Sequence, residues 1–219
     1  MGNATLILGE SGSGKSTSLR NLDHSKTVII NVLDKPLPFK GYRAKYNITL
    51  KNYSSTDNTE TILRSIKKVN DERPEITTLV IDDFQYVLAN EYMRRASEIG
   101  YRKFTDIGSN AWKIIKALTE TRDTLDCFIL THNAIDLDGK SKIKTIGKML
   151  DEKVTLEGMF TVILHTIIKD GVYKFLTNSD GVHMSKSPLG MFNDLLIDND
   201  LSSVKEIINN YNLEELHNA

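Results

Sequence analysis

Short apolar runs alternate with longer amphipathic stretches from the start of the chain to about residue 130. The apolar runs are too short for helices and are bounded by polar or turn-forming residues, which is typical of strands buried on both faces. These runs lie at residues 4–8, 27–31, 78–81 and 127–130. The amphipathic stretches between them predict helices at residues 15–22, 57–69, 84–99 and 104–122.

The pattern changes in the last third of the chain. Residues 138–153 are rich in lysine and glycine, and they predict a loop with a short helix. Asp170-Gly171 then separates two apolar stretches, 160–168 and 172–177. This arrangement is a strong signal for a β-hairpin with a two-residue turn.

Two helix starts are marked by the spacing of a capping box, in which an N-terminal side chain and an acid three residues later satisfy free backbone amides. Asp57 and Glu60 have this spacing, and so do Ser203 and Glu206 before a C-terminal helix. Strands that alternate with helices and are followed by a hairpin predict an α/β fold. We expect one domain, residues 1–219, with a mainly parallel central sheet flanked by helices, a C-terminal β-hairpin and a terminal helix.

The glycine-rich segment after the first strand carries the most specific motif of the chain. Residues 9–16, Gly-Glu-Ser-Gly-Ser-Gly-Lys-Ser, match the P-loop pattern in full, between a predicted strand and a predicted helix. The glycines let successive backbone amides point into one concavity that suits phosphate. The residues expected to bind ATP are Gly9, Glu10, Ser11, Gly12, Ser13, Gly14, Lys15, Ser16 and Thr17. Lys15 would reach the β and γ phosphates, and the Ser16 hydroxyl would bind Mg²⁺.

An acidic pair ends the third predicted strand. Asp82 follows the apolar run 78–81, and Asp83 comes directly after it. Because ligands bind at the carboxyl ends of strands in open α/β sheets, Asp82 is expected beside the P-loop as a second Mg²⁺ ligand. Asp83 either polarises the attacking water or caps the helix that follows.

Two other polar residues follow predicted strands and are further catalytic candidates. His132, in Thr131-His132-Asn133, ends the fourth strand and either senses the γ-phosphate or is a satisfied buried histidine. Asp34 lies just beyond the second strand and either activates water or serves as a turn residue before Lys35-Pro36.

Composition limits the possible partners and surroundings. The formal net charge is −1, so any nucleic-acid surface has to be local rather than a property of the whole protein. The single cysteine, Cys127, lies in an apolar run and cannot form an internal disulfide, which favours a reducing cytoplasm. No apolar run has the roughly 18 residues that a membrane span needs, so no membrane partner is expected.

Two local patches are candidates for single-stranded nucleic acid, although solvated surface is the plainer interpretation of each. The first is a set of lysines directly after His132: Lys140, Lys142, Lys144, Lys148 and Lys153. The second mixes basic and aromatic side chains between two predicted helices: Arg94, Arg95, Tyr101, Arg102, Lys103 and Phe104.

Taken together, these motifs resemble the RecA-like P-loop ATPases encoded by bacteriophages, which include phage nucleotide-binding AAA proteins and the Sak group of single-strand annealing proteins. The resemblance covers most of the chain. It depends on the P-loop, residues 80–83, residues 131–133, Gly147-Lys148-Met149-Leu150 and Ser185-Lys186-Ser187-Pro188.

The resemblance implies a RecA-type core that hydrolyses ATP, binds single-stranded DNA and assists recombination, strand annealing or replication. It further implies a homo-oligomer, contacts with replication or recombination proteins, and a bacterial cytoplasm as the place of action. By position, residues 140–153 correspond to the DNA-binding loop, and Lys186 to a lysine that acts at the nucleotide of a neighbouring subunit. The chain departs from the pattern in two ways: the first strand begins near Ala4, without an N-terminal extension, and no glutamate follows the second strand, where Asp34 is the nearest acid.

Two other function classes share the P-loop. A nucleotide or small-molecule kinase would need a lid with arginines, whereas residues 139–153 contain lysines and no arginine. A non-catalytic switch that binds ATP and recruits a replication partner would need no water-activating acid at all.

Overall fold

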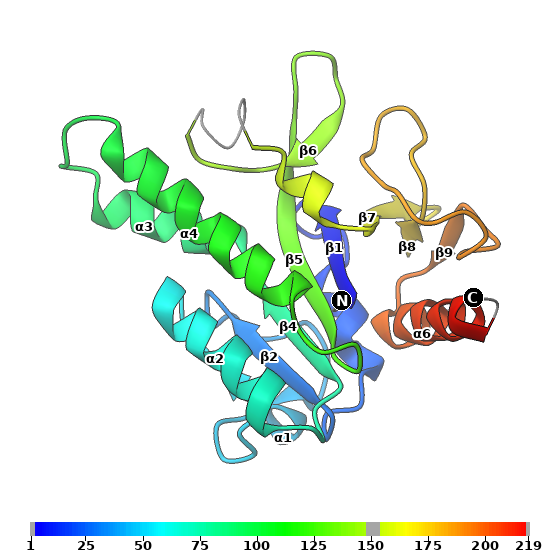
Figure 1. The fold of residues 1–219 in the computed structure, drawn as a ribbon. Helices are drawn as coiled ribbons and strands as arrows, with labels where there is room; N and C mark the ends of the chain where they lie inside the picture. The colour runs from blue at the N-terminus through cyan, green and yellow to red at the C-terminus, as the bar shows by residue number, and fades with distance from the viewer. Residues whose placement is uncertain (1–2, 148–153, 218–219) are drawn as a thin grey trace.

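The computed structural model describes residues 3–147 and 154–217, and in this part of the chain it shows an α/β fold (Figure 1). Its nine-stranded, mostly parallel sheet has the order β3-β2-β4-β5-β1-β7-β8-β9, and β6 pairs with the end of β5. The parallel strands are β1 (Asn3–Gly9), β2 (Thr27–Asn31), β3 (Tyr53–Ser54), β4 (Thr78–Asp82), β5 (Asp126–Ile135) and β7 (Val162–Lys169). The antiparallel additions are β6 (Ser141–Ile143), β8 (Val172–Leu176) and β9 (Leu196–Asp198).

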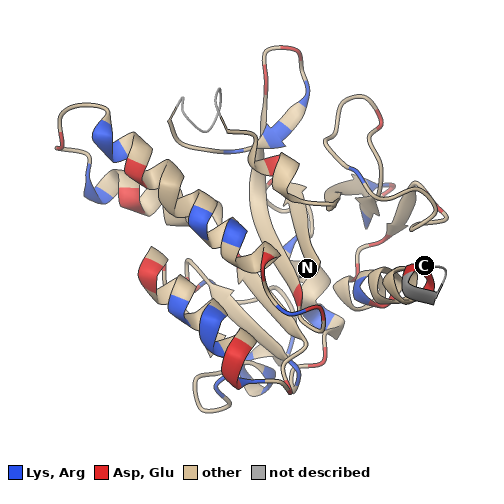
Figure 2. Ribbon diagram, in the orientation of Figure 1, with Lys and Arg blue, Asp and Glu red and all other residues tan. Residues whose placement is uncertain are grey.

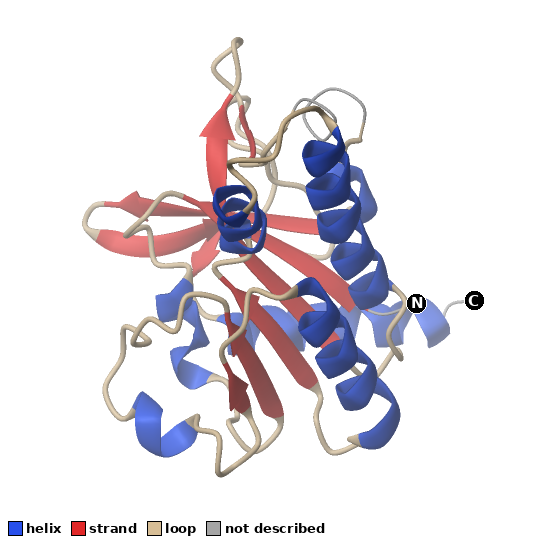
Figure 3. Cartoon of the chain, turned by 90° about the vertical axis from the view of Figure 1, so that its left-hand side faces the viewer, coloured by secondary structure: helices blue, strands red, loops and turns tan. Residues whose placement is uncertain are grey.

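Helices cover both faces of this sheet (Figure 3). One face packs against α2 (Thr59–Glu72), α3 (Gln85–Arg94) and α4 (Arg102–Thr119). The other packs against the 3₁₀ helix η1 (Ser16–Asn21) and α6 (Leu201–His217). Alternate residues of β4 serve the two layers, since Leu79 and Ile81 belong to the first core and Val80 to the second. Burial on both faces explains the unbroken apolar runs of the central strands.

Short helical segments complete the fold. They are α1 (Tyr42–Lys45) and the 3₁₀ helix η2 (Leu156–Met159). Cys127 lies buried in β5, where burial raises the pKa of its thiol to about 12, so it behaves as an apolar core residue. Within residues 3–147 and 154–217, no helix has the length and apolar character that a membrane crossing requires.

The predicted capping boxes were wrong by one and three residues. Asn58 caps α2 by accepting a hydrogen bond from the Thr61 amide at 3.0 Å, and Asp57 instead pairs with Arg94. At α6, Asp200 accepts from the Ser202 amide at 2.9 Å, so the helix begins at Leu201 and Ser203 lies within its first turn. In both cases a neighbouring Asx side chain satisfies the free amides at the start of the helix.

The helix predicted at 15–22 is a 3₁₀ helix, Ser16–Asn21, rather than an α-helix. Within it the Ser18 hydroxyl donates to the Lys15 carbonyl, and such a bond competes with α-helical pairing. The predicted hairpin around Asp170-Gly171 is confirmed: β7 and β8 pair with Lys169 opposite Val172.

The order of the strands places a crevice at their carboxyl ends. After β1 the chain turns to the face covered by η1, whereas after β4 it turns to the face covered by α3. β5 lies between β1 and β4 in the sheet. The carboxyl ends of these three strands therefore lie side by side, at the place where the chain leaves β1 and β4 toward opposite faces of the sheet. In open α/β sheets, ligands bind at such points.

Candidate nucleotide-binding site

The P-loop, residues 9–16, connects β1 to η1 along this crevice. Gly14 has a φ of +100°, a conformation that side chains rarely adopt. A Cβ atom at Gly14 would also lie only 2.9 Å from the ring of Tyr173 on β8. Glycine is therefore required here both by the backbone and by the close approach of the hairpin.

The ammonium of Lys15 is enclosed by its own loop. The residue is 6% exposed, and its Nζ donates to the carbonyl oxygens of Gly9 at 2.8 Å and Glu10 at 2.7 Å. Burial lowers the pKa of Lys15 to about 8, although Asp82 and Asp83 act in the opposite direction. A cation held this way in a concave loop is a ready partner for an anion that brings stronger acceptors than two carbonyls.

Ser16 and Asp82 meet on the other side of Lys15. The Ser16 hydroxyl donates to Asp82 Oδ1 at 3.0 Å, and the Asp83 amide donates to the same oxygen at 3.0 Å. Asp82 is 2% exposed, and burial together with the charge of Asp83 raises its pKa to about 6. A hydroxyl beside a desolvated carboxylate is an oxygen pair that suits Mg²⁺.

The protein itself offers few further metal ligands. Within the described ranges, no group of three or more histidine, cysteine, aspartate or glutamate side chains has a geometry that would hold a metal ion. A magnesium ion at Ser16 and Asp82 would therefore take its remaining ligands from phosphate and water, as Mg²⁺ usually does at nucleotide sites.

Lys15, Ser16 and Asp82 line a cavity of about 270 Å³. Its lining combines the P-loop, the acidic pair, the loop after β2, the end of β5 and β8. The lining residues are Ser11, Gly12, Gly14, Lys15, Ser16, Thr17, Lys35, Pro36, Pro38, Asp82, Asp83, His132 and Tyr173. The structure thus brings together most of the nucleotide-site residues that the sequence predicted, from the ends of the three strands β1, β4 and β5.

Asp83 points into the cavity and does not cap the following helix. Its carboxylate lies 2.8 Å from the Lys35 ammonium and 3.8 Å from His132 Nε2. Helix α3 begins with Phe84 as its N-cap residue and has no side-chain cap. The φ of Asp83 is +62°, an unusual conformation for a residue other than glycine, and strain of this kind tends to be retained at functional sites.

The end of β5 adds polar groups to the same edge. His132 lies edge-on against the ring of Tyr86, with ring centroids 6.1 Å apart. Burial, with the nearby charge of Lys15, lowers its pKa, so the imidazole is neutral at pH 7. Beside it, Thr131 Oγ1 and Asn133 Oδ1 are buried without a hydrogen-bond partner among the described residues. These two atoms leave hydrogen-bonding capacity unused at the end of β5, where His132 is the residue that lines the cavity.

Asp34 lies apart from this cluster. It is exposed, does not line the cavity, and accepts a hydrogen bond from the Tyr53 hydroxyl at 2.9 Å. Its φ of +54° belongs to the turn after β2, which agrees with its interpretation as a turn residue. The neighbouring Lys35 enters the cavity instead.

Sequence reasoning missed two cavity residues, Lys35 and Tyr173. Lys35 lies in the loop after the buried strand β2, so its place near the carboxyl edge was available from the same rule that identified Asp82. Tyr173 reaches the P-loop only because β8 folds back on β7, and no local pattern indicates that contact.

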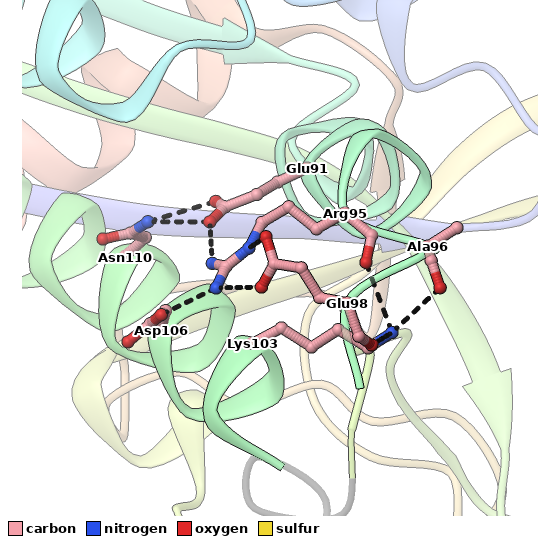
Figure 4. A network of polar contacts seen from close by, with 7 residues as sticks. All are labelled: Glu91, Arg95, Ala96, Glu98, Lys103, Asp106 and Asn110. Carbon is pink, nitrogen blue, oxygen red and sulfur yellow. Dashed lines mark hydrogen bonds and ion pairs between the residues drawn. The ribbon is translucent and has the colours of Figure 1, made fainter. Parts of the chain in front are cut away.

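Two members of the basic and aromatic patch between α3 and α4, Arg95 and Lys103, belong to a network of polar contacts within the protein (Figure 4). Lys103 is 7% exposed and donates to the carbonyl oxygens of Arg95, Ala96 and Glu98, the last at 2.8 Å. Its prediction as a nucleic-acid contact was wrong, because its ammonium satisfies carbonyls just beyond the C-terminal end of α3. The Arg95 guanidinium forms ion pairs with Glu91, Glu98 and Asp106. Arg102 remains exposed.

In the lysine-rich stretch after His132, residues 138–147 complete a β-hairpin where a loop was predicted, and the rest of the predicted loop and short helix, residues 148–153, lies outside the described residues. β5 extends to Ile135 and pairs with β6, so that the hairpin projects beyond the sheet (Figures 1 and 2). Lys140 and Lys144 are exposed, and Lys142 is half-buried. The Lys144 amide donates to the His132 carbonyl at 2.9 Å, which joins the base of the hairpin to the cavity wall. Lys148 and Lys153 lie outside the described residues.

Lys186 lies away from the nucleotide cavity of its own chain. Its backbone pairs with Ile163, and its side chain is exposed. It borders a second cavity of about 430 Å³, whose wall also includes Lys140 and Lys142 of the hairpin.

A buried histidine of β7, His165, contacts the ring of the half-buried His183. His165 lies opposite Leu8 of β1, is 2% exposed, and contacts the His183 ring, with centroids 4.7 Å apart. Its Nδ1 has no hydrogen-bond partner among the described residues. Burial, followed by the charges of His183 and other neighbours, lowers the pKa of His165 to about 4.

This pair predicts acid sensitivity of the fold. The pKa of His165 is depressed in the folded state, so the unfolded chain takes up its proton first as the pH falls from about 6.5 to 4. We expect this to remove up to about 3 kcal/mol of stability over that interval. Urea unfolding of a His165→Leu variant should show a smaller loss between pH 7 and 4.5 than the wild type. A His24→Leu variant, altered at an exposed histidine, should match the wild type, and equal acid sensitivity of all three proteins would contradict the prediction.

Comparison with models of known protein families found no match, and a search of the curated proteins found none either.

Proposed function

We propose that the protein binds ATP with Mg²⁺ in the P-loop cavity and hydrolyses it, as a RecA-like ATPase of the kind encoded by bacteriophages. The observation that carries this proposal is the arrangement of three groups. The enclosed ammonium of Lys15, the glycine-rich backbone and the Ser16–Asp82 pair all line one cavity. A cation, free loop amides and two oxygen ligands for a metal are together the requirements of a bound triphosphate.

Each residue then has a defined role. Lys15 would exchange its two carbonyl partners for phosphate oxygens, and Ser16 with Asp82 would hold the magnesium ion. When bound, the ion would offset the negative charge of the phosphates. Asp83 and neutral His132 face the same space and are the groups that can orient an attacking water.

We further propose that single-stranded DNA binds along the β5–β6 hairpin, and that the protein assists recombination, strand annealing or replication as a homo-oligomer. The exposed lysines of the hairpin supply sequence-independent charge for a phosphate backbone. The hydrogen bond between the Lys144 amide and the His132 carbonyl connects the hairpin directly to a residue of the nucleotide cavity. A shift of the hairpin on binding DNA would therefore move His132. In such an oligomer, Lys186 of one copy would face the nucleotide of the next.

An ATPase assay with and without single-stranded DNA tests this assignment. The wild type should hydrolyse ATP faster when DNA is added, and the stimulation should fall as salt rises. A Lys140→Ala/Lys144→Ala variant should lose most of the stimulation while keeping its basal rate. The matched control, Lys68→Ala/Lys113→Ala, removes two exposed lysines from α2 and α4. Equal stimulation of both variants would rule out the hairpin as the DNA contact.

A non-catalytic switch is the second candidate, and one observation favours it. Asp83 is already neutralised by Lys35, and Asp34 lies outside the cavity. Single-turnover measurements with excess protein would separate the two functions. Tight ATP binding without phosphate release, with or without DNA, would favour the switch.

A further inference from the structure

The loop after β2 brings a second cation, Lys35, into the P-loop cavity. Its Nζ lies 2.8 Å from Asp83 Oδ2 and 5.7 Å from the centroid of the Tyr86 ring. The Lys35 side chain is freer to move than the Asp83 side chain, because it is 56% exposed and that of Asp83 only 8%. An ion pair with one solvated partner is easily rearranged, whereas the carboxylate is fixed in place.

A hydrogen bond and a proline fix the backbone at Lys35. Asn31, buried at the end of β2, donates from its Nδ2 to the Lys35 carbonyl at 2.7 Å. Pro36 follows and restricts the chain, while the lysine side chain itself remains free to change partners. The ammonium has three donors, and the hydrogen bond to Asp83 uses one of them.

The sheet order shows which end of a nucleotide Lys35 would meet. Lys35 follows β2, whereas Tyr173 is on β8, and these strands lie on opposite sides of β1. The cavity therefore has an acidic, metal-binding end at Asp82 and Asp83 and an aromatic end at Tyr173. The flat apolar base suits the aromatic end, so the terminal phosphate belongs at the acidic end, beside Lys35.

A terminal phosphate in that position would face the carboxylate of Asp83 directly. Two anions so close repel each other unless a cation lies between them. Lys35 is the cation that the structure places there, and it reaches Asp83 already.

We propose, building on the assigned ATP site, that Lys35 distinguishes ATP from ADP by bridging the terminal phosphate and Asp83. Lys15 contacts phosphates that both nucleotides share, whereas Lys35 gains a partner only when the third phosphate is present. In the absence of that phosphate, Lys35 stays on Asp83 and keeps the carboxylate from acting on water. Lys35 is thus a specificity residue, and its removal should affect the two nucleotides unequally.

Calorimetric titration with two probes tests this inference: Mg²⁺-ADP and Mg²⁺-adenylyl imidodiphosphate, an ATP analogue that is not hydrolysed. Lys35→Ala should weaken binding of the analogue about ten- to hundredfold and change ADP binding less than about twofold. Lys35→Arg should retain part of the preference, and Lys40→Ala, an exposed lysine of the same loop, should behave as wild type. Thermal unfolding of each variant checks that the fold is intact.

An Asp83→Asn/Lys35→Ala double variant separates phosphate contact from simple neutralisation of Asp83. If Lys35 contacts phosphate, the double variant still binds the analogue weakly. If Lys35 only balances the charge of Asp83, removing that charge restores binding, and the inference is overturned. Equal weakening for both probes, or none for the analogue, also overturns it. A wild-type protein that binds neither probe would overturn the ATP site itself together with this inference.

Discussion

A Lys15→Ala variant is expected to lose ATP binding by about a hundredfold or more and to remain folded. Two charge-assisted hydrogen bonds to phosphate are each worth about 1.5–3 kcal/mol, and both disappear with the ammonium. The fold should tolerate the change because the cation is buried at a cost, as the lowered pKa of about 8 shows. Calorimetry measures the loss of ATP binding. Thermal unfolding tests whether the variant is folded, and we expect its midpoint temperature to be equal to or above that of the wild type.

The control for this variant is Lys113→Ala, which removes an exposed lysine from α4. It should bind ATP as the wild type does. If Lys15→Ala retained wild-type affinity, the P-loop would not be the phosphate site, whatever its sequence. If it lost affinity only because it unfolded, the melting curve would show this.

An Asp82→Asn variant should lose Mg²⁺-dependent hydrolysis about a thousandfold and gain stability at neutral pH. Asn keeps an Oδ1 acceptor for both the Ser16 hydroxyl and the Asp83 amide, so the local geometry is retained. It cannot supply the negative charge that the metal ion requires. The loss should appear as a turnover that no longer responds to added magnesium.

The gain in stability follows from the pKa of Asp82. A folded-state value of about 6 lies above the ordinary value of 3.8, so the folded state disfavours the carboxylate. The contribution of Asp82 to wild-type stability therefore falls as the pH rises from about 4 to 6, by up to about 3 kcal/mol, and Asp82→Asn lacks this loss. Asp138→Asn, at the exposed tip of the hairpin, is the control and should change neither property. An Asp82→Asn protein less stable than wild type at pH 7 would contradict this account of the site.

The strands and the converging edge of the sheet could be predicted because each central strand is buried on both faces. That burial requires continuous apolar runs, as at 78–81, and the rule that ligands bind at carboxyl ends then placed Ser16, Asp82 and His132 together. Helix starts were less predictable. Asn58 and Asp200 lie close to the predicted caps, and the choice among neighbouring polar side chains depends on the path of the turn.

The errors at charged residues share a different cause. A sequence shows that Lys103 and Lys35 are charged but does not show what each one faces. The Lys103 ammonium binds carbonyl oxygens beyond the end of α3, and the Lys35 ammonium lies in the cavity beside Asp83. Partners from distant parts of the chain decided both outcomes, as they did for Tyr173 against Gly14.

Titration of the wild-type protein with ATP, in the presence and absence of Mg²⁺, tests the central claim most directly. The geometry of Lys15, Ser16 and Asp82 predicts saturable binding of one ATP per chain, with the affinity markedly reduced when the metal is chelated. A titration with no heat and no saturation, in protein whose melting curve shows that it is folded, would contradict the claim.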